Sequence, residues 1–189
     1  MAVIRTFIAI ETPAEIKDAM VSVQEQLKES KADVRWESEE KLHATIKFLG
    51  DVQENILTSV LSAIKKSAVK FPHFLLNYQG IGCFPNMRNP NVIWIGCHNA
   101  DGTLEQIKNT LDDELEVFGF VKEKRNFSPH ITLGRVKGPS RLRDLTSLIE
   151  KVTFEPKGAI VKTVTVLRSK LKPQGSEYSI LDEVPLQQP

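Results

Sequence analysis

The chain has 189 residues, of which 41% are hydrophobic and 26% are charged, and its formal net charge is +1. This length allows one sizeable domain or two small lobes with a shared core, and the composition is that of a globular protein, which excludes a disordered chain. No apolar run reaches the roughly 18–20 residues that a membrane-spanning helix needs, and residues 1–5 lack the features of a signal peptide, so we expect a cytoplasmic protein.

The cysteines and the charge distribution indicate which metals and ligands this chain is suited to bind. Cys83 and Cys97 are the only cysteines and form no C-x-x-C pair, so we expect two reduced structural thiols and neither a disulfide nor a zinc site. Residues 120–172 contain 13 Lys and Arg against 4 Asp and Glu, a net charge of +9, whereas the rest of the chain has 12 against 20, a net charge of −8. The basic segment is suited to a phosphate-bearing ligand, although solvated surface charges are the simpler explanation.

Two strand–helix pairs are predicted in the first third of the chain. The β-branched and aromatic run Val3–Glu11 predicts a buried strand, and residues 12–15 form a helix-capping signal. The segment around Trp36 is expected to be extended. Leu42–Leu49 alternates between apolar and polar residues and predicts a half-buried strand that ends at residues 50–51. Asp51 and Glu54 form a capping signal for the second helix. Apolar residues at helical spacing mark the two helices: Ile16, Met20, Val23 and Leu27, then Leu57, Val60, Leu61 and Ile64.

The rest of the chain predicts further strands and two more helices. An extended region over 71–97 is broken at residues 84–86 and by a turn at Asn89–Asn91. A third helix should begin at Asp101 or Thr103. The following elements are a strand at Pro129–Arg135, a short helix near Arg141–Glu150, and strands at Val152–Phe154, Gly158–Leu171 and Glu177–Leu181. This order predicts an α+β fold with mostly antiparallel sheets that carry helices on one side.

Two short stretches of the chain repeat one pattern, His43-x-Thr45 and His130-x-Thr132, each flanked by aliphatic residues. Side chains two residues apart on a strand point to the same face, so each stretch presents an imidazole and a hydroxyl together. The two copies lie in similar helix–strand–helix surroundings, which indicates a degenerate internal duplication. We therefore expect residues 1–189 to form a single bilobal domain with one motif on each of two facing lobes.

Two imidazoles on either side of a phosphodiester can divide acid–base work. A neutral imidazole takes a proton from water, and a protonated one gives a proton to the leaving alkoxide. Threonine hydroxyls can donate to the non-bridging phosphate oxygens, and such a site needs neither a metal nor another cofactor. A 2′,3′-cyclic phosphate has a suitable internal geometry for this in-line attack. The candidate catalytic residues are His43 and His130, and the candidate phosphate ligands are Thr45 and Thr132.

Two basic residues near the motifs are further candidates for substrate binding. Lys47 alternates onto the face of His43, although a solvated lysine is the simpler interpretation. Arg135 follows the second motif, but strict alternation puts it on the face opposite that motif, and it reaches the site only if the strand twists or ends near Gly134. Phe48 alternates to the apolar side and is expected to pack in the core.

The remaining candidates have weaker signals. Arg5 is a possible residue of the cleft floor. Three aromatic residues could stack on a base, but packing in the core or in loops is expected for them: Trp36, Phe84 and Trp94. His73 and His98 lack a threonine partner and are expected to be non-catalytic.

The paired motifs resemble those of the 2H phosphoesterase superfamily. More closely, the chain is similar to the bacterial and archaeal RNA 2′,3′-cyclic phosphodiesterases, also called 2′-5′ RNA ligases. The matching segments run the length of the chain: residues 5–10, 42–50, 82–85, 92–96, 128–135 and 167–171, with Gly175 and Tyr178.

The resemblance implies a bilobal α+β fold in which two mostly antiparallel sheets flank a central cleft and the helices lie outside. It also implies metal-independent hydrolysis of RNA 2′,3′-cyclic phosphate ends to 2′-phosphates. In that reaction His43 and His130 are the acid–base pair and Thr45 and Thr132 bind phosphate; we expect His130 to activate water and His43 to protonate the leaving 3′-oxygen. The expected partners are RNA or nucleotides with a cyclic phosphate, tRNA fragments among them, with no membrane association, and we expect a monomer.

Two other functions remain open from the sequence. The same site could catalyse reversible 2′-5′ ligation of tRNA halves. Alternatively, the basic segment 120–172 could serve a non-catalytic RNA-binding module, whose binding would depend steeply on salt.

Overall fold

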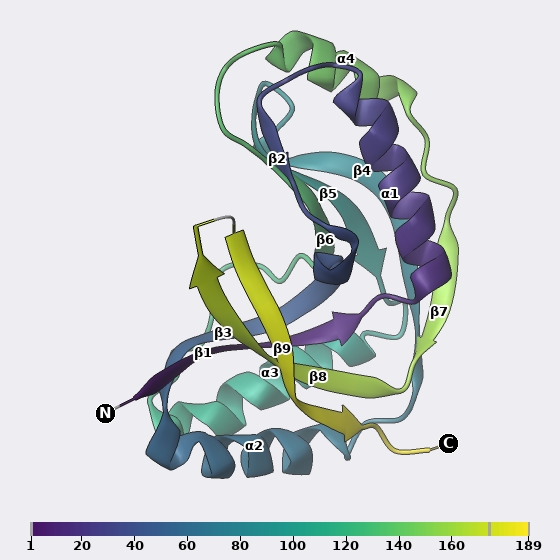
Figure 1. Ribbon diagram of the computed structural model, residues 1–189. Helices are drawn as coiled ribbons and strands as arrows, with labels where there is room; N and C mark the ends of the chain where they lie inside the picture. The colour runs from purple at the N-terminus through teal and green to yellow at the C-terminus, as the bar shows by residue number, and fades with distance from the viewer. Residues whose placement is uncertain (1, 174, 189) are drawn as a thin grey trace.

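The computed structural model describes residues 2–173 and 175–188 (Figure 1). The strands in these ranges are β1 (Val3–Glu11), β2 (Val34–Trp36), β3 (His43–Gln53), β4 (Phe74–Asn86), β5 (Asn89–His98), β6 (His130–Val136), β7 (Lys157–Val161), β8 (Thr163–Lys172) and β9 (Gly175–Pro185). The helices are α1 (Ala14–Lys28), α2 (Glu54–Ala68), α3 (Thr103–Leu115) and α4 (Leu142–Lys151), and a 3₁₀ turn at Glu39–Lys41 precedes β3. Within the same ranges, no helix is long and apolar enough to cross a membrane.

The strands form one antiparallel sheet that runs through both lobes. Its order is β7-β4-β5-β6-β3-β1-β8-β9, and β2 pairs with β6 beside this path. One lobe contains β2 and β4 to β7, the other contains β1, β3, β8 and β9, and the pairing of β3 with β6 joins them. The sheet curls strongly between the lobes (Figure 1). The predicted α+β class and antiparallel pairing are confirmed, while the two predicted sheets are continuous with each other.

The helices lie on the outside of the curled sheet and are exchanged between the lobes. α1 and α4 contact each other against the lobe of β4 to β7, and α2 and α3 pack together beneath β1 and β3 (Figure 1). α1 follows a strand of one lobe but covers the other, and α3 does the same in the opposite direction. This exchange ties the two lobes to each other.

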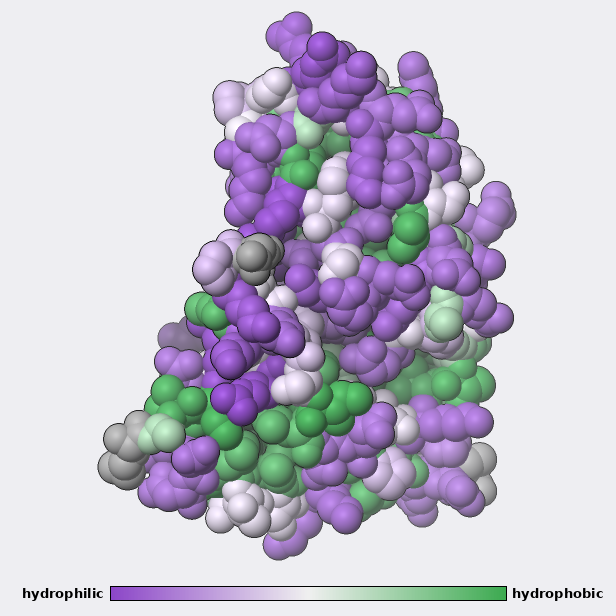
Figure 2. Space-filling model, in the orientation of Figure 1, coloured by the Kyte–Doolittle hydropathy of each residue, from purple (hydrophilic) through white to green (hydrophobic). Residues whose placement is uncertain are grey.

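The hydrophobic core lies between the sheet and the helices. The predicted apolar stripe of α1 is buried, with Met20 and Leu27 fully enclosed, and burial of each such side chain stabilises the fold by about 1.5–3 kcal/mol. A second, smaller cluster of Phe7, Ala9 and Leu167 lies on the opposite face of β1 and β8. Because residues 6–10 of β1 are buried on both faces, Phe7–Ile10 is a continuous apolar run. The outer surface seen in Figure 2 is mostly hydrophilic, and hydrophobic residues show mainly on the lower lobe.

Two predicted helix starts are wrong in detail. β3 continues past Gly50 to Gln53 because β1 pairs with it along this whole length, and Gly50 adopts a φ of +70° within the strand. Asp51 therefore lies inside β3, and Gln53 is the residue that precedes α2. Pro13, not Thr12, precedes α1, and the Thr12 hydroxyl has no hydrogen-bond partner in the described part of the chain.

Three other predicted boundaries differ from the structure. The turn predicted at Asn89–Asn91 lies earlier, because the Asn86 Oδ1 accepts hydrogen bonds from two backbone amides, at 3.0 and 3.1 Å, and closes the β4–β5 hairpin there. Val152–Phe154 is not a strand. The predicted strand Gly158–Leu171 is two strands, β7 and β8, which separate at Lys162.

Candidate active site

The two His-x-Thr motifs lie on neighbouring strands. β3 and β6 are antiparallel, and their register pairs Ala44 with Ile131, the central residues of the two motifs. Both central side chains are buried in the core, so the flanking histidines and threonines project from the opposite face. This register places each histidine across from the threonine of the other motif. The four side chains therefore form one compact motif array, with the two histidines on its diagonal.

A β-bulge follows each motif and reverses the alternation of side chains. The register of β3 against β1 skips Ile46, and the register of β6 against β5 skips Leu133. One extra residue in a strand moves every later residue to the other face. Phe48 and Arg135, each five residues after its histidine, therefore lie on the same face as the motif array.

The bulges correct three predictions that rested on strict alternation. Phe48 was predicted to pack in the core, but its side chain is 71% exposed. Lys47 was predicted to share the face of His43, but it is buried on the helix side of the sheet. Arg135, which strict alternation put on the far face, reaches the site.

His43 is enclosed by aromatic rings. Its imidazole stacks on Phe7, with ring centroids 5.1 Å apart, and meets the edge of Tyr178 at 5.4 Å. Its Nδ1 is buried and has no hydrogen-bond partner among the described residues. Burial, and secondarily the charge of Lys17, lowers the pKa of His43 to about 4. His43 is therefore neutral at neutral pH in the free protein.

His130 has a similar aromatic setting in the other lobe but a different hydrogen bond. Its ring meets Phe84 edge-on at 4.9 Å and lies 6.5 Å from Trp94. Its Nδ1 is 2.7 Å from the Ser128 carbonyl oxygen, and because a carbonyl only accepts, this nitrogen carries the proton that it donates. Burial lowers the pKa of His130; the bond to Ser128 opposes this shift, and the charge of Arg135 adds to it.

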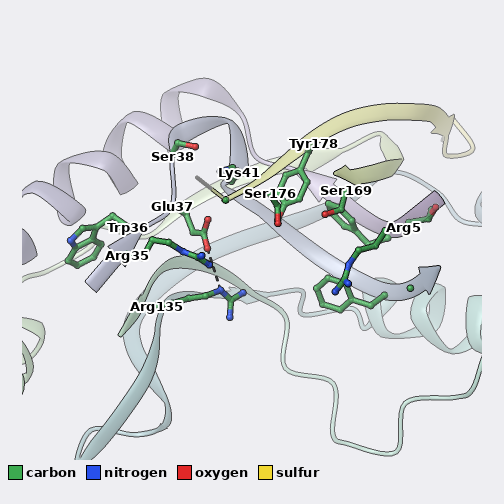
Figure 3. Close-up of a pocket in the computed structure, with 15 residues that line it drawn as sticks. Arg5, Arg35, Trp36, Glu37, Ser38, Lys41, Arg135, Ser169, Ser176 and Tyr178 are labelled. Carbon is green, nitrogen blue, oxygen red and sulfur yellow. Dashed lines mark ion pairs between the residues drawn. The ribbon is translucent and has the colours of Figure 1, made fainter. Parts of the chain in front are cut away.

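The bulge before Arg135 is fixed by a buried amide. Gln24 of α1 donates from Nε2 to the carbonyl oxygens of Leu133 and Glu37, both at 2.8 Å. The backbone amide of Glu37 also donates to the Leu133 oxygen, at 2.9 Å. The Glu37 carboxylate then pairs with the guanidinium of Arg135, with Nε and Oε1 3.3 Å apart (Figure 3). α1 thus anchors the segment that turns Arg135 toward the site.

Lys47 has its partners on the side of the sheet away from the motif array. Its ammonium forms a buried ion pair with Asp112 of α3 and donates to the Val121 carbonyl oxygen at 3.0 Å. Lys108 pairs with the same carboxylate, with Nζ and Oδ2 2.8 Å apart. This placement gives Lys47 the role of joining β3 to α3, in contrast to the predicted contact with substrate.

A pocket of about 500 Å³ adjoins the motif array, and its size is typical of a small-molecule site. Both lobes contribute to its lining. Phe7 and Tyr178, whose rings contact His43, form part of its wall, so the pocket opens beside the first motif. Its charged lining residues are Arg5, Arg35, Glu37, Lys41 and Arg135 (Figure 3).

Of the other aromatic candidates, Phe84 and Trp94 lie beside His130, and Trp36 and Trp94 each pack against a glycine. Trp36 borders the pocket, but its ring points away from it (Figure 3) and lies against Gly134, where a Cβ atom would be 2.9 Å from the ring. Trp94 covers Gly82 in the same way.

Several residues at the site were assigned no role from the sequence. Phe7 and Tyr178 around His43, and Arg35 and Lys41 in the pocket, come from strands and turns that only the sheet pairing brings together. The sequence could have suggested Phe48 as a site residue, since Phe48 and Arg135 each lie five residues after the histidine of their motif. In the part of the chain that the structure describes, the pocket lining includes no histidine and neither motif threonine, so the motif array lies beside the pocket and not in its wall.

Comparison with known families finds two matches within this chain. The model described as LigT-like phosphoesterase matches residues 10–94 and, a second time, residues 95–178. Each match contains one of the two His-x-Thr motifs. The internal duplication predicted from the motifs is therefore confirmed.

Curated relatives align with almost the whole chain. An RNA 2′,3′-cyclic phosphodiesterase of Thermotoga maritima is 35% identical over 180 residues, which cover 95% of this chain and 94% of the relative. An RNA 2′,3′-cyclic phosphodiesterase of Methanothermobacter thermautotrophicus is 33% identical over 180 residues, with 95% and 97% of the two chains covered.

Solved structures share the fold. A structure from Thermus thermophilus superposes with a TM-score of 0.80 at 25% identity, covering 97% of this chain and 98% of that one. E. coli LigT in complex with 3′-AMP superposes with a TM-score of 0.77 at 25% identity, with the same coverage. The resemblance predicted from the motifs is confirmed over most of the chain, which belongs to the LigT-like phosphoesterase family.

Proposed function

We propose that this protein hydrolyses the 2′,3′-cyclic phosphate at the 3′ end of RNA to a 2′-phosphate, with His43 and His130 as the acid–base pair. The observation that carries this proposal is the register of Ala44 with Ile131, since it sets both histidines and both threonines on one face. The names of the relatives at 33% and 35% identity support the reaction, and the 3′-AMP held by E. coli LigT supports a nucleotide ligand.

The diagonal of the motif array suits a phosphate held between the two histidines. Diagonal neighbours in an antiparallel pair are about 7–8 Å apart, which leaves room for a tetrahedral phosphate between their side chains. Water attacks phosphorus from the side opposite the 3′-oxygen, and one histidine accepts its proton. The bond from phosphorus to the 3′-oxygen breaks, and the other histidine donates a proton to that oxygen. The products are a 2′-phosphate and a free 3′-hydroxyl.

The neighbouring donors stabilise the charge that develops on the phosphate. Thr45 and Thr132 donate from their hydroxyls to the non-bridging oxygens, and the Arg135 guanidinium supplies a positive charge beside them. In this mechanism no metal ion or other cofactor takes part.

The surroundings of the two rings favour His43 as the base and His130 as the acid. A pKa of about 4 keeps His43 neutral and able to accept a proton. The Ser128 carbonyl stabilises a protonated His130, whose Nε2–H is then free to donate, and a bound phosphate anion opposes the lowering of its pKa by burial. This assignment reverses the one predicted from the sequence, which had no information on the burial of either ring.

Phe48 is suited to hold the nucleobase next to the cyclic phosphate. Its ring is 71% exposed on the face of the motif array and lies 5.9 Å from the ring of Phe7. Unpaired bases at RNA ends commonly stack on aromatic side chains of this kind.

Hydrolysis of a nucleoside 2′,3′-cyclic phosphate in the presence of EDTA tests the proposal. We expect a 2′-phosphate product, and a rate lower by about 10²–10⁴-fold in His43→Ala and in His130→Ala. Activity that survives both substitutions, or a requirement for metal, would exclude the two-histidine mechanism. A 3′-phosphate product would contradict the proposal, because it would show that the bond from phosphorus to the 2′-oxygen breaks.

The two alternative functions give different results in related assays. Joining of RNA halves that carry a cyclic phosphate and a 5′-hydroxyl, faster than hydrolysis, would favour the 2′-5′ ligase. RNA binding with a steep salt dependence and no turnover would favour the binding module.

A further inference from the structure

The pocket beside the motif array carries more positive charge than one cyclic phosphate requires. A 2′,3′-cyclic phosphate bears one negative charge, which Arg135 already faces in the proposed function. Three further cations line the pocket: Arg5 from β1, Arg35 from β2 and Lys41 from the 3₁₀ turn. Within residues 2–173 and 175–188, none of these three forms an ion pair, and Glu37, the one carboxylate in the lining, pairs with Arg135.

The cations are spread across the whole width of the pocket. Arg35 and Arg135 are register partners on β2 and β6, and both lie on one side (Figure 3). Arg5 lies on the other side, with Lys41 and Tyr178 between them (Figure 3). Because like charges repel, such a row of cations favours a ligand with several negative charges along its length.

Exposed aromatic surface lies beside these cations. Phe48 and Tyr178 both line the pocket, and the Phe48 ring is largely exposed. Sites for single-stranded nucleic acid combine a positively charged groove, which follows the backbone, with aromatic rings on which bases stack.

The chemistry of the substrate sets the direction in which it must leave the motif array. An RNA whose 3′ end is a cyclic phosphate continues only on its 5′ side, so the preceding nucleotides need a surface next to the reactive phosphate. We propose that this pocket is an upstream subsite, in which Arg5, Arg35 and Lys41 bind the backbone phosphates that precede the reactive end. The inference rests on the proposed function and narrows the preferred substrate to an RNA strand of more than one nucleotide.

Comparison of a trinucleotide and a mononucleotide tests the subsite, both ending in a 2′,3′-cyclic phosphate. In the triple variant Arg5→Gln/Arg35→Gln/Lys41→Gln, we expect kcat/KM for the trinucleotide to fall about tenfold or more and that for the mononucleotide to stay within about twofold. The salt dependence of log kcat/KM for the trinucleotide should become shallower by about 1.4, because two backbone phosphates precede its reactive end and each contact with a single-strand phosphate contributes about 0.7.

A matched control removes three charges elsewhere. Lys65, Lys66 and Arg143 are exposed on α2 and α4 and do not line the pocket, so their triple Gln variant has the same net charge. It should leave both substrates and the salt slope unchanged. An equal loss on both substrates, or an equal effect of the control variant, would overturn the subsite.

Direct binding separates failure of the subsite from failure of the proposed function. Fluorescence anisotropy of a labelled trinucleotide with a 2′-phosphate end measures affinity whether or not turnover occurs. Weaker binding by the pocket variant than by the control supports the subsite even if no hydrolysis is seen, in which case only the proposed reaction fails. Equal affinity of the two variants would refute the subsite even if the cyclic phosphate is hydrolysed.

Discussion

Replacement of Gln24 by methionine tests whether the bulge after the second motif positions Arg135. Gln24 is 3% exposed, and its side-chain amide donates to the carbonyl oxygens of Leu133, in the bulge, and of Glu37. Methionine has a similar length but no donor. The Leu133 oxygen keeps the hydrogen bond from the Glu37 amide, whereas the Glu37 oxygen loses the partner that the described residues give it.

The expected cost follows from these two bonds. One partly buried carbonyl left unpaired lowers the free energy of unfolding by about 1–3 kcal/mol. In a chain of this size each kcal/mol lowers Tm by about 2–4 °C, so Tm should fall by about 2–12 °C. If Arg135 loses its orientation, one charge-assisted hydrogen bond to the phosphate is lost, worth about 1.5–3 kcal/mol. The corresponding fall in kcat/KM is about 10–150-fold.

A double-mutant cycle separates positioning from general destabilisation. We expect Gln24→Met to lower kcat/KM in the parent protein and to have almost no further effect in an Arg135→Ala background, because the two changes remove the same interaction. Assays of the cyclic mononucleotide, well below the Tm of each variant, provide the four values. Additive effects on kcat/KM, or a lower Tm with unchanged kcat/KM, would refute the positioning role of Gln24.

Three further predictions concern charge and stacking. Burial lowers the pKa of His43 from 6.5 to about 4, so the unfolded state takes up a proton that the folded state resists. The free energy of unfolding should therefore fall by about 2–3 kcal/mol between about pH 7 and 4.5. Urea titrations should show a smaller fall in His43→Gln, and equal falls in the two proteins would contradict this. Asp112→Asn leaves two buried ammonium groups without a counter-charge and should lower the free energy of unfolding by about 3–5 kcal/mol. Lys47→Met should lower it by less, because Asp112 stays paired with Lys108. A lower Tm for Lys47→Met than for Asp112→Asn would contradict this order. Phe48→Ala should change stability by less than about 0.5 kcal/mol but raise KM about 5–150-fold, and a loss of Tm with unchanged KM would show that the ring has a packing role.

Most elements were predictable because their signals are local. The stripe of Leu104, Ile107, Leu111 and Leu115 predicts α3, and all four residues are buried. The wrong boundaries depend on partners distant in sequence. Gly50 is a turn signal by itself, yet β1 supplies a pairing partner beyond it, and the strand continues.

The motif residues were predictable as candidates, but their arrangement was not. A His-x-Thr pattern on a strand predicts that the two side chains share a face, and both motifs follow this rule. The register of Ala44 with Ile131 joins strands 87 positions apart, and no local pattern specifies it. The aromatic enclosure of His43 by Phe7 and Tyr178, and hence its low pKa, depends on the same long-range pairing.

The two bulges give the duplicated site its asymmetry. Each motif is followed by an extra residue at the same position, so each lobe turns its fifth residue after the histidine toward the motif array. In one lobe that residue is Phe48, and in the other it is Arg135. A terminal nucleotide is asymmetric in the same sense, with an apolar base on one side of its ribose and an anionic phosphate on the other. The exchange Phe48→Arg/Arg135→Phe puts the charge beside the base and the ring beside the phosphate, so it should abolish turnover of the cyclic mononucleotide. An unchanged kcat/KM would contradict this reasoning.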